Sequence, residues 1–434
     1  MAERGCSVAG QAYVRRVVDE ELDWLLTSLP AVALEGPKAV GKTMTALQRA
    51  ATVGHLDDAQ IREVVGADPQ QVVAGDAPVL VDEWQRFPES WDRVRRAVDD
   101  DPTPGRFLLT GSAPGVHQPV HSGAGRIVSV AMRPMSLQER WGSDTTVSLA
   151  EMLAGGPAPI GGRCDATLGD YVEEIVASGF PAIRAITDRR ARQAQLDSYI
   201  EAVIRRDFDE AGYPVRKPAL LRRWLRAYAA ATATTASYEA VRDAATPGEA
   251  DKPAKSTVQA YRDVLEALRL VEPVPAWIPQ RSPLQELGHA SKHHLADPAL
   301  AARLLNVDAS ALLGGFPVQA PSPRDGTLLG QLFESLVTLC VRVYAQAAGA
   351  RVAHLRQHRG RREIDLVVQG DDHRLVALEV KLSATVDGGD TKHLQWLRDQ
   401  LGEDLADAAV ITTGSYAYRR RDGIAVVPAA LLGP

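Results

Sequence analysis

The sequence predicts a multidomain α/β protein whose N-terminal part is a parallel sheet with helices on both faces. At 434 residues the chain is too long for one ordinary core. Apolar runs of strand length alternate with helical stretches through the first 150 residues, as in parallel-sheet folds. A largely helical middle follows, and a second alternation of helix and strand begins near Gly326.

Composition sets broad limits on the class of protein. Hydrophobic residues make up 45% and charged residues 24%, which is typical of a soluble globular chain. The net charge of -6 argues against a protein that coats nucleic acid, although a local basic site remains possible.

The cysteines and the N-terminus indicate a reducing compartment. Cys6, Cys164 and Cys340 are scattered without metal-ligand spacing, so we expect neither a disulfide framework nor a zinc site. The opening MAERGCSVAG lacks the apolar run of a signal peptide. No segment approaches the roughly 18–20 uninterrupted apolar residues of a membrane helix. We therefore expect a cytoplasmic protein without a membrane partner.

The N-terminal elements follow from the apolar pattern. Residues 1–30 predict a polar lead helix, and the first strand is followed by a glycine-bounded loop and a helix. The predicted strands are 31–34, 78–81, 106–109 and 126–131.

The loop after the first strand, GPKAVGKT, fits the phosphate-loop pattern GxxxxGK[ST] and lies between a strand and a helix, as that motif requires. Glycines let backbone N–H groups surround phosphates, Lys42 adds a cation at the β- and γ-phosphates, and the Thr43 hydroxyl offers a ligand to Mg²⁺. The predicted nucleotide-binding residues of the loop are Gly36, Pro37, Lys38, Ala39, Val40, Gly41, Lys42 and Thr43. The motif predicts ATP and Mg²⁺ as cofactors.

A second strand, PVLVDE, supplies the acids that such a site needs. Asp82 is expected to hold Mg²⁺, and Glu83 to orient and deprotonate the attacking water. This Asp-Glu pair and the long multidomain tail favour an ATPase over a small-molecule kinase, which shares only the phosphate loop.

The next strand ends in TGS, where Thr110 or Ser112 is expected to contact the γ-phosphate or the attacking water. Arg126, in SGAGRI, is a candidate for the arginine that stabilises transition-state charge, from the same subunit or a neighbour. Arg133 is the weaker alternative, and an ordinary surface arginine remains open for Arg126.

The middle of the chain predicts helices. A Gly/Pro-rich stretch at 154–163 reads as a linker or surface loop. Three helices and a turn-rich strand pair then give the element order of a winged helix, a DNA-binding variant of the helix-turn-helix. The helical ranges are 169–212, 218–232, 236–246 and 256–270, and the strand pair is expected within 277–295.

The last part carries a set of acids in the order helix, strand, strand. Glu334 lies on a predicted helix, Asp365 on a strand, and Glu379 and Lys381 on the next strand, where residues two apart share a face. A hairpin would bring Asp365 beside them. Such carboxylates can hold one Mg²⁺ with a catalytic lysine, the logic of metal-dependent phosphodiester cleavage. Alternating charge on an edge strand is the competing interpretation.

Basic residues surround the same region. They could contact phosphates or form a solvated turn. They are Arg351, His354, Arg356, His358, Arg359, Arg361 and Arg362.

Together these motifs resemble a widespread prokaryotic family of AAA-type ATPases joined to a C-terminal domain of uncharacterised, restriction-endonuclease-like (PD-(D/E)xK-type) character. The matching segments are YVRR (13–16), GPKAVGKT (36–43), LVDEWQ (80–85), LLTGSA (108–113), GAGRI (123–127), RPMSLQE (133–139), SGFP (178–181), RRDF (205–208), KHHLADPAL (292–300), GQLFESLV (330–337), REIDLVV (362–368) and LEVK (378–381).

The resemblance implies ATP and Mg²⁺ roles for Lys42, Thr43, Asp82 and Glu83, and nuclease-like roles for the C-terminal acids and Lys381. Two departures stand out. Lys38-Ala39 replaces a common Arg-Gln pair, and the polar segment 243–255 is long for a link between winged-helix helices.

We therefore expect four parts. They are an AAA-type ATPase domain at 1–150, a helical lid or linker at 151–215, a winged-helix-like domain at 216–315 and a restriction-endonuclease-like domain at 316–434. The expected function is a Mg²⁺-dependent ATPase that acts on or with DNA. The alternative is an ATP-driven conformational switch that binds a protein partner without nuclease activity. The number of subunits stays open.

Overall fold

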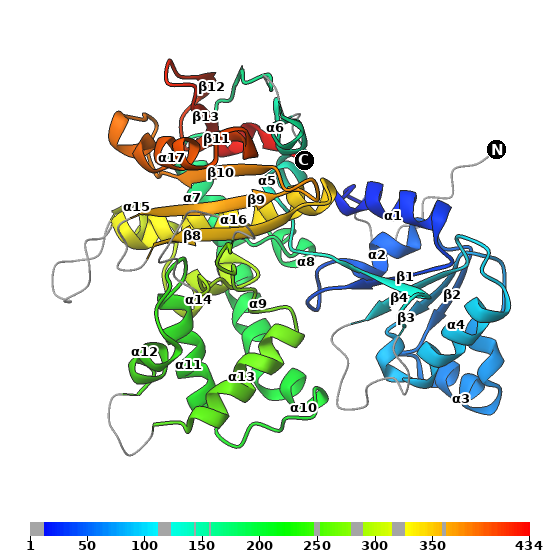
Figure 1. Ribbon diagram of the computed structural model, residues 1–434. Coiled ribbons are helices and arrows are strands. Elements are labelled where there is room, and N and C mark those ends of the chain that lie inside the picture. The colour runs from blue at the N-terminus through cyan, green and yellow to red at the C-terminus, as the bar shows by residue number, and fades with distance from the viewer. Residues whose placement is uncertain are drawn as a thin grey trace. The chain divides into compact units, whose positions relative to one another are not determined.

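Short apolar runs in the N-terminal part form the strands of one parallel sheet (Figure 1). The computed structural model describes residues 13–111, 123–142, 145–155, 158–246, 252–278, 290–314, 326–357 and 362–434. Within these ranges the N-terminal strands are β1 (Ala31–Glu35), β2 (Thr52–His55), β3 (Val79–Asp82), β4 (Phe107–Gly111) and β5 (Ile127–Ala131). Their order is β2-β3-β4-β1-β5, and every pairing is parallel. The expected parallel sheet is confirmed.

Helices cover both faces of this sheet. Ala33 and Leu109 are buried in a cluster with Val94 of α4, whereas the alternate positions, such as Val32 and Leu108, are equally buried on the opposite face. Strands buried on both faces explain why the runs are continuously apolar rather than alternating. The helical elements are α1 (Val18–Ser28), α2 (Lys42–Leu47), α3 (Ala59–Ala67), α4 (Glu89–Asp100) and the 3₁₀ turns η1 (Pro69–Val73) and η2 (Trp84–Arg86).

The chain divides into two compact units. The first runs to Arg133 and includes Arg205–Val215 and Asp263–Arg269. The second comprises Pro134–Ile204, Arg216–Arg262 and Leu270–Pro434. The uninterrupted N-terminal stretch of the first unit thus ends at Arg133, and most of the middle helices share a unit with the C-terminal sheet.

The middle region is helical, as expected. After three of its helices, α11 to α13, two short segments pair antiparallel through the bridges Val271–Leu295 and Val274–Lys292. The first of these segments precedes the range 277–295 expected for the strand pair, and residues 279–289 lie outside the described ranges. The elements are α5 (Leu137–Trp141), α6 (Leu149–Ala154), α7 (Leu168–Ala177), α8 (Pro181–Arg184), α9 (Arg189–Ala202), the π-helical turn η3 (Val203–Asp207), α10 (Phe208–Glu210), α11 (Pro218–Ala230), α12 (Tyr238–Ala244), α13 (Lys255–Ala267), α14 (Pro298–Leu304) and α15 (Ala309–Gly314).

The C-terminal part forms a mixed sheet. Among the described residues its strand order is β7-β12-β13-β11-β10-β9-β8, with β8, β9 and β10 antiparallel and β11 parallel to β10. The predicted hairpin between the last two acidic strands is therefore confirmed. The elements are α16 (Gly326–Ala347), β8 (Arg351–Arg356), β9 (Glu363–Gln369), β10 (Leu375–Val380), α17 (Gly388–Leu401), η6 (Gly402–Asp404), β11 (Leu405–Thr412), β12 (Tyr416–Arg419), β13 (Ala425–Pro428) and η7 (Ala429–Leu431), with the short strands β6 (Val147–Ser148), β7 (Gly162–Arg163) and β14 (Leu432–Gly433).

Two features tie this sheet to its surroundings. The segment after α13 continues alongside β8, where Trp277 N–H donates to the His354 carbonyl at 2.7 Å, and Trp277 joins the core of the sheet. Helix α16 packs against α7, β8 and β9. Its stretch Leu328–Ala347 is, within the described part of the chain, the one helix apolar and long enough to cross a membrane, but 72% of its most apolar window is buried inside the fold. We interpret it as a core helix.

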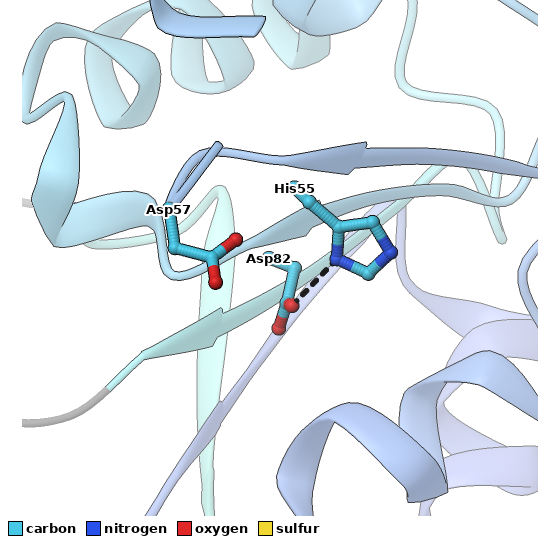
Figure 2. A group of neighbouring side chains, drawn as sticks. All are labelled: His55, Asp57 and Asp82. Carbon is cyan, nitrogen blue, oxygen red and sulfur yellow. Dashed lines mark hydrogen bonds and ion pairs between the residues drawn. The ribbon is translucent and has the colours of Figure 1, made fainter. Parts of the chain in front are cut away.

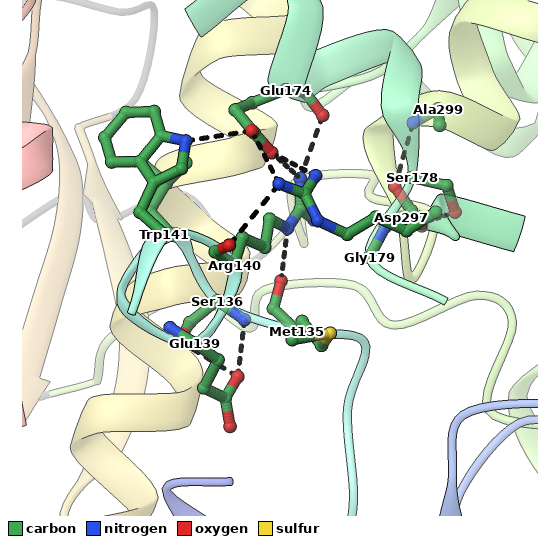
Figure 3. A network of polar contacts seen from close by, with 12 residues as sticks. Met135, Ser136, Glu139, Arg140, Trp141, Glu174, Ser178, Gly179, Asp297 and Ala299 are labelled. Carbon is green, nitrogen blue, oxygen red and sulfur yellow. Dashed lines mark hydrogen bonds and ion pairs between the residues drawn. The ribbon is translucent and has the colours of Figure 1, made fainter. Parts of the chain in front are cut away.

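A buried polar network joins several of the sequence motifs in the second unit (Figure 3). The Arg140 guanidinium, whose side chain is fully buried, donates to the Met135 carbonyl at 2.6 Å and the Glu174 carbonyl at 2.8 Å. Trp141 Nε1 and the Arg184 guanidinium donate to the Glu174 carboxylate at 2.6–2.9 Å. The RPMSLQE motif contributes the Met135 carbonyl to this network.

The SGFP and KHHLADPAL motifs meet nearby. Ser178 Oγ and the Gly179 N–H both donate to Asp297 Oδ2, at 2.6 and 2.7 Å, and the other carboxylate oxygen caps α14 by accepting from the Ala299 N–H at 3.0 Å (Figure 3). An aspartate that accepts three hydrogen bonds while buried fixes one backbone arrangement of both segments. Asp297 thus holds the two segments together.

Candidate functional site

The predicted phosphate site lies at the carboxyl edge of the N-terminal sheet. In parallel strands all carboxyl ends meet at one edge, and ligands bind there in open α/β sheets. The registers pair His55 with Asp82 and Asp82 with Thr110, while β1 ends at Glu35, directly before the phosphate loop. Residues from four strands thus converge on one place.

The loop Gly36–Thr43 is shaped by two of its glycines. A Cβ at Gly36 would stand 2.3 Å from the Met132 carbonyl oxygen, so no larger residue fits without backbone movement. Gly41 has φ 108°, a left-handed conformation that L side chains disfavour, and it immediately precedes α2. These two positions explain why the motif requires glycine there.

Lys42 begins α2 and folds back over the loop. Its ammonium donates to the carbonyls of Gly36 and Pro37, both at 2.9 Å, and the residue is buried. Burial lowers the pKa of Lys42 to about 8, although the nearby carboxylates of Glu83 and Asp82 act in the opposite direction. A buried cation held by two neutral carbonyls is well placed to exchange them for phosphate oxygens.

Asp82 is the centre of the polar contacts at this edge. Thr43 Oγ1 donates to Asp82 Oδ1 at 2.8 Å, and Thr110 Oγ1 donates to the same oxygen. The hydroxyl and carboxylate predicted to share Mg²⁺ are therefore adjacent. Thr110 orients Asp82 in this structure, whereas Ser112 lies outside the described residues.

Two further residues, His55 and Asp57, lie beside Asp82 at the carboxyl edge of the sheet, and they were not predicted from the sequence. His55 Nδ1 lies 2.9 Å from Asp82 Oδ2, and Asp57 stands on the other side of that carboxylate (Figure 2). Ligand atoms of His55, Asp57 and Asp82 all lie within 4.8 Å of one another. A histidine and two carboxylates are a donor set that accepts a divalent cation. The available signal was a histidine followed by two acids after a short strand.

Glu83 follows Asp82 in a left-handed backbone conformation, with φ 54°. A non-glycine residue in this region is uncommon and is often held there by its surroundings. Its carboxylate accepts from Gln85 Nε2 at 2.6 Å, which fixes the side chain at the carboxyl edge, beside Lys42. This placement fits the role predicted for a water-activating base.

The segments around the loop hold it in place. Arg16 Nη1 donates to the Val40 carbonyl at 3.1 Å, and Tyr13 shares a hydrogen bond of 3.0 Å with Thr45 of α2. On the opposite side Lys38 pairs with Asp207 at 2.6 Å and with Glu210 at 2.7 Å. The YVRR and RRDF motifs therefore brace the phosphate loop, and Lys38 takes part through its side chain.

Arg126 lies far from this edge within its own subunit. It directly precedes β5, and Ile127 pairs with Ala31, the first residue of β1, so Arg126 is at the amino edge of the sheet. Its guanidinium is half-exposed and pairs with Asp99 at 2.8 Å. The length of β1, roughly 15 Å, separates it from the phosphate loop. The structure does not bring Arg126 to the site of its own chain.

Comparison with known proteins matches three regions of the chain. Residues 28–141 match a family model described as an AAA domain. The match supports an AAA-type P-loop ATPase domain in this part of the chain. Residues 168–311 and 329–432 match two models described as domains of unknown function, DUF8612 and DUF4143. The match supports the expectation of an ATP-binding domain, and the nuclease-like expectation stays a prediction.

The relatives that are similar over most of the chain are uncharacterised, so they do not indicate a function. Uncharacterised proteins of Mycobacterium bovis and Mycobacterium tuberculosis are each 24% identical over 422 residues, which is 96% of this chain and 83% of theirs. The Walker-type ATPase of Pyrococcus abyssi is 14% identical, with a TM-score of 0.36, over 66% of this chain and 94% of that one.

The C-terminal acids do come together, but around a lysine that the sequence reading did not include. Lys292 Nζ lies 2.9 Å from Glu334, 2.8 Å from Asp365 and 3.4 Å from Glu363. Lys381 pairs separately with Glu379 at 2.8 Å.

The pKa directions in this cluster follow from burial and from Lys292. Burial raises the pKa of Glu334 and of Glu379 to about 8 in each case. Burial acts likewise on Asp365, but Lys292 outweighs it and the pKa of Asp365 falls below its usual value. The cluster is thus a buried, lysine-bridged group of carboxylates.

The basic patch predicted beside the acids is only partly present. His354 is buried, and burial lowers its pKa to about 4, so it carries no charge near neutral pH. Arg356 donates to Thr235, and Arg362 stacks over the Trp396 ring at 5.3 Å. His358, Arg359 and Arg361 lie outside the described residues.

Proposed function

We propose that this protein hydrolyses ATP with Mg²⁺ at the carboxyl edge of its N-terminal sheet. The observation that carries the proposal is the 2.8 Å hydrogen bond between Thr43 and Asp82, directly beside the buried Lys42. These are the hydroxyl, the carboxylate and the cation that P-loop enzymes place around the metal and the terminal phosphates. The AAA-domain match of residues 28–141 supports the same function.

Each residue has a defined task in this proposal. Lys42 exchanges the carbonyls of Gly36 and Pro37 for β- and γ-phosphate oxygens. Thr43 and Asp82 would hold Mg²⁺, which when bound neutralises charge on the phosphates. Glu83 accepts the proton of the attacking water.

Substitution of the predicted base tests the proposal. Glu83→Gln is expected to lower kcat for ATP hydrolysis by about 10²–10⁴-fold, the usual share of a general base, while ATP affinity is retained. Glu89→Gln, an exposed glutamate on α4, is the matched control and should leave kcat unchanged. Equal kcat values for wild type and Glu83→Gln would remove Glu83 from the mechanism.

We propose in addition that Arg126 serves a neighbouring subunit. Its position at the amino edge leaves its own phosphate loop out of reach, while its exposure allows contact with another copy. Specific ATPase activity should then rise with protein concentration and fall in Arg126→Ala. A specific activity that is flat with concentration would contradict a shared site.

For the partner we propose DNA, bound by the region of α11 to α13 and the paired segments that follow. The support is the element order, three helices and then the antiparallel bridges Val271–Leu295 and Val274–Lys292. Fluorescence anisotropy with labelled duplex, with and without ATP, tests it. Binding should weaken steeply with salt, because phosphate contacts release counterions. Failure to bind at low salt, with ATP-dependent capture of a protein, would favour the switch that binds a protein partner.

A further inference from the structure

A metal-dependent nuclease would need its carboxylates free to bind a divalent cation, and the second unit does not offer that. The Lys292 ammonium stands among Glu334, Glu363 and Asp365, with its Nζ at 2.8–3.4 Å from one oxygen of each. An ammonium has three N–H donors, and here three carboxylates surround it. Lys292 itself is only 1% exposed. The Lys292 ammonium therefore occupies the position in which a divalent cation would bind.

Other carboxylate oxygens of the predicted nuclease site also accept hydrogen bonds. Asp365 Oδ2 accepts from the Val380 N–H at 2.9 Å, and Glu379 Oε1 accepts from Lys381 at 2.8 Å. Glu379 Oε2 is buried without a hydrogen-bond partner within the described residues. Among those residues, the three-ligand group with a spacing suited to a metal is His55, Asp57 and Asp82, in the other unit.

Lys292 is fixed in this place by its backbone. Its N–H and carbonyl both bond to Val274, each at 2.9 Å. The neighbouring His293 N–H donates to the Thr234 carbonyl at 2.9 Å, and His294 Nδ1 lies 3.3 Å from Ser335 Oγ. These hydrogen bonds hold the main chain at Lys292, and the three ion pairs hold its ammonium among the carboxylates.

We propose that Lys292 is the permanent cation of this site, in place of a divalent metal, and that the C-terminal region is a binding scaffold without metal-dependent nuclease activity. The bridge also joins three separate parts of the second unit, namely the segment before α14, helix α16 and strand β9. In this proposal the acids that predict a nuclease have a structural role, because they pair with Lys292 inside the fold. This inference is independent of the phosphate loop in the first unit.

Counting bound Mn²⁺ in the full-length protein tests the proposal. Electron paramagnetic resonance of free Mn²⁺ gives the stoichiometry, in the absence of nucleotide, for wild type, Asp365→Asn, Lys292→Met and the Lys292→Met/Asp365→Asn double variant. Wild type and Asp365→Asn should bind the same number of ions. Lys292→Met should gain one ion, because it frees the carboxylates, and the double variant should lose that ion again.

Two results would overturn the proposal. One is the loss of one Mn²⁺ from wild type on Asp365→Asn, with Glu379→Gln giving the same loss. The other is a folded Lys292→Met protein that gains no ion. If Lys292→Met does not fold, the comparison of wild type with Asp365→Asn and Glu379→Gln still decides, since a metal used by the native site must disappear in these variants.

Discussion

Glu174 in the buried network of the second unit offers a sharp test of how that unit is held together. Glu174→Gln keeps the shape of the side chain and removes its charge. Glu174 accepts from Trp141 and Arg184, and its carboxylate lies 3.5 Å from the Arg140 guanidinium, which has no solvent exposure. The substitution therefore leaves a buried cation with weakened compensation.

The magnitude follows from burial. Removal of one partner from a buried ion pair costs about 3–5 kcal/mol, and the low end applies because glutamine still accepts hydrogen bonds. For a unit of this size that loss lowers the unfolding midpoint by roughly 5–8 °C. Glu173→Gln is the matched control, since the Glu173–Arg189 pair is exposed at 38% and 68%. That substitution should cost less than about 1 kcal/mol.

The pH dependence adds an independent check. Burial raises the pKa of Glu174, but Arg184 and Arg140 outweigh it, and the net pKa lies below its usual value. A carboxyl with a depressed folded-state pKa stabilises the fold above its unfolded pKa and loses that contribution as pH falls through the folded value. The gap between wild type and Glu174→Gln should be full at pH 7 and narrow below roughly pH 4.3, the usual value for glutamate.

Differential scanning calorimetry of the full chain measures both effects. The expected result is a lower second-unit transition for Glu174→Gln at pH 7, a near-native one for Glu173→Gln, and convergence of wild type and Glu174→Gln in acid. A Glu174→Gln midpoint equal to that of Glu173→Gln, or a gap that persists unchanged in acid, would refute the reasoning.

Three further predictions concern single contacts. Thr110→Val removes a donor to the buried Asp82 and should destabilise the first unit by about 1.5–3 kcal/mol, measured by urea unfolding; an unchanged midpoint would mean that the contact carries no weight. Lys38→Ala breaks a partly exposed pair with Asp207, and hydrogen exchange at 205–210 should speed up while stability changes by less than about 1 kcal/mol. Lys292→Met leaves buried carboxylates without a cation and should cost about 3–5 kcal/mol, whereas an unchanged unfolding midpoint would show that the bridge is dispensable.

The prediction of an ATP site rests on local determinants. The loop Gly36–Thr43 carries its own backbone geometry, and the apolar run before Asp82 marks a strand buried on both faces. His55 could not be predicted in the same way. Its strand, Thr52–His55, is short and only half-buried, so no apolar run marks it, and its neighbour relation to Asp82 depends on strand order. Strand order is a property of the whole sheet.

Lys292 shows a different limit. It precedes the nearest of its carboxylate partners by about 40 residues and stands in a motif, KHHLADPAL, that gives no hint of an ion-pair partner. Only the fold brings it between α16 and β9. The acids themselves are predictable, since alternation along β10 places Glu379 and Lys381 together. What the carboxylates hold, a metal or a lysine, depends on a residue from outside the motif.

The division of the chain into compact units depends on the whole fold for a related reason. The sequence predicts a boundary between residues 315 and 316. In the structure Trp277 packs in the core of the C-terminal sheet, so the two regions share one unit. Composition shows which segments are polar. Whether two segments share a core depends on which apolar side chains pack together in the fold, as Trp277 does with the C-terminal sheet.

Direct measurement of ATP binding tests the central claim, that Lys42 and its loop bind the phosphates of ATP. Isothermal titration calorimetry with MgATP should give one site per chain in wild type and in Lys392→Ala, an exposed lysine of the second unit. Lys42→Ala should lose ATP binding. Within the described residues, Lys42 is the side chain that places a cation at the carbonyls of Gly36 and Pro37, where the phosphates are expected to bind. Equal affinity of Lys42→Ala and wild type for ATP would contradict the account.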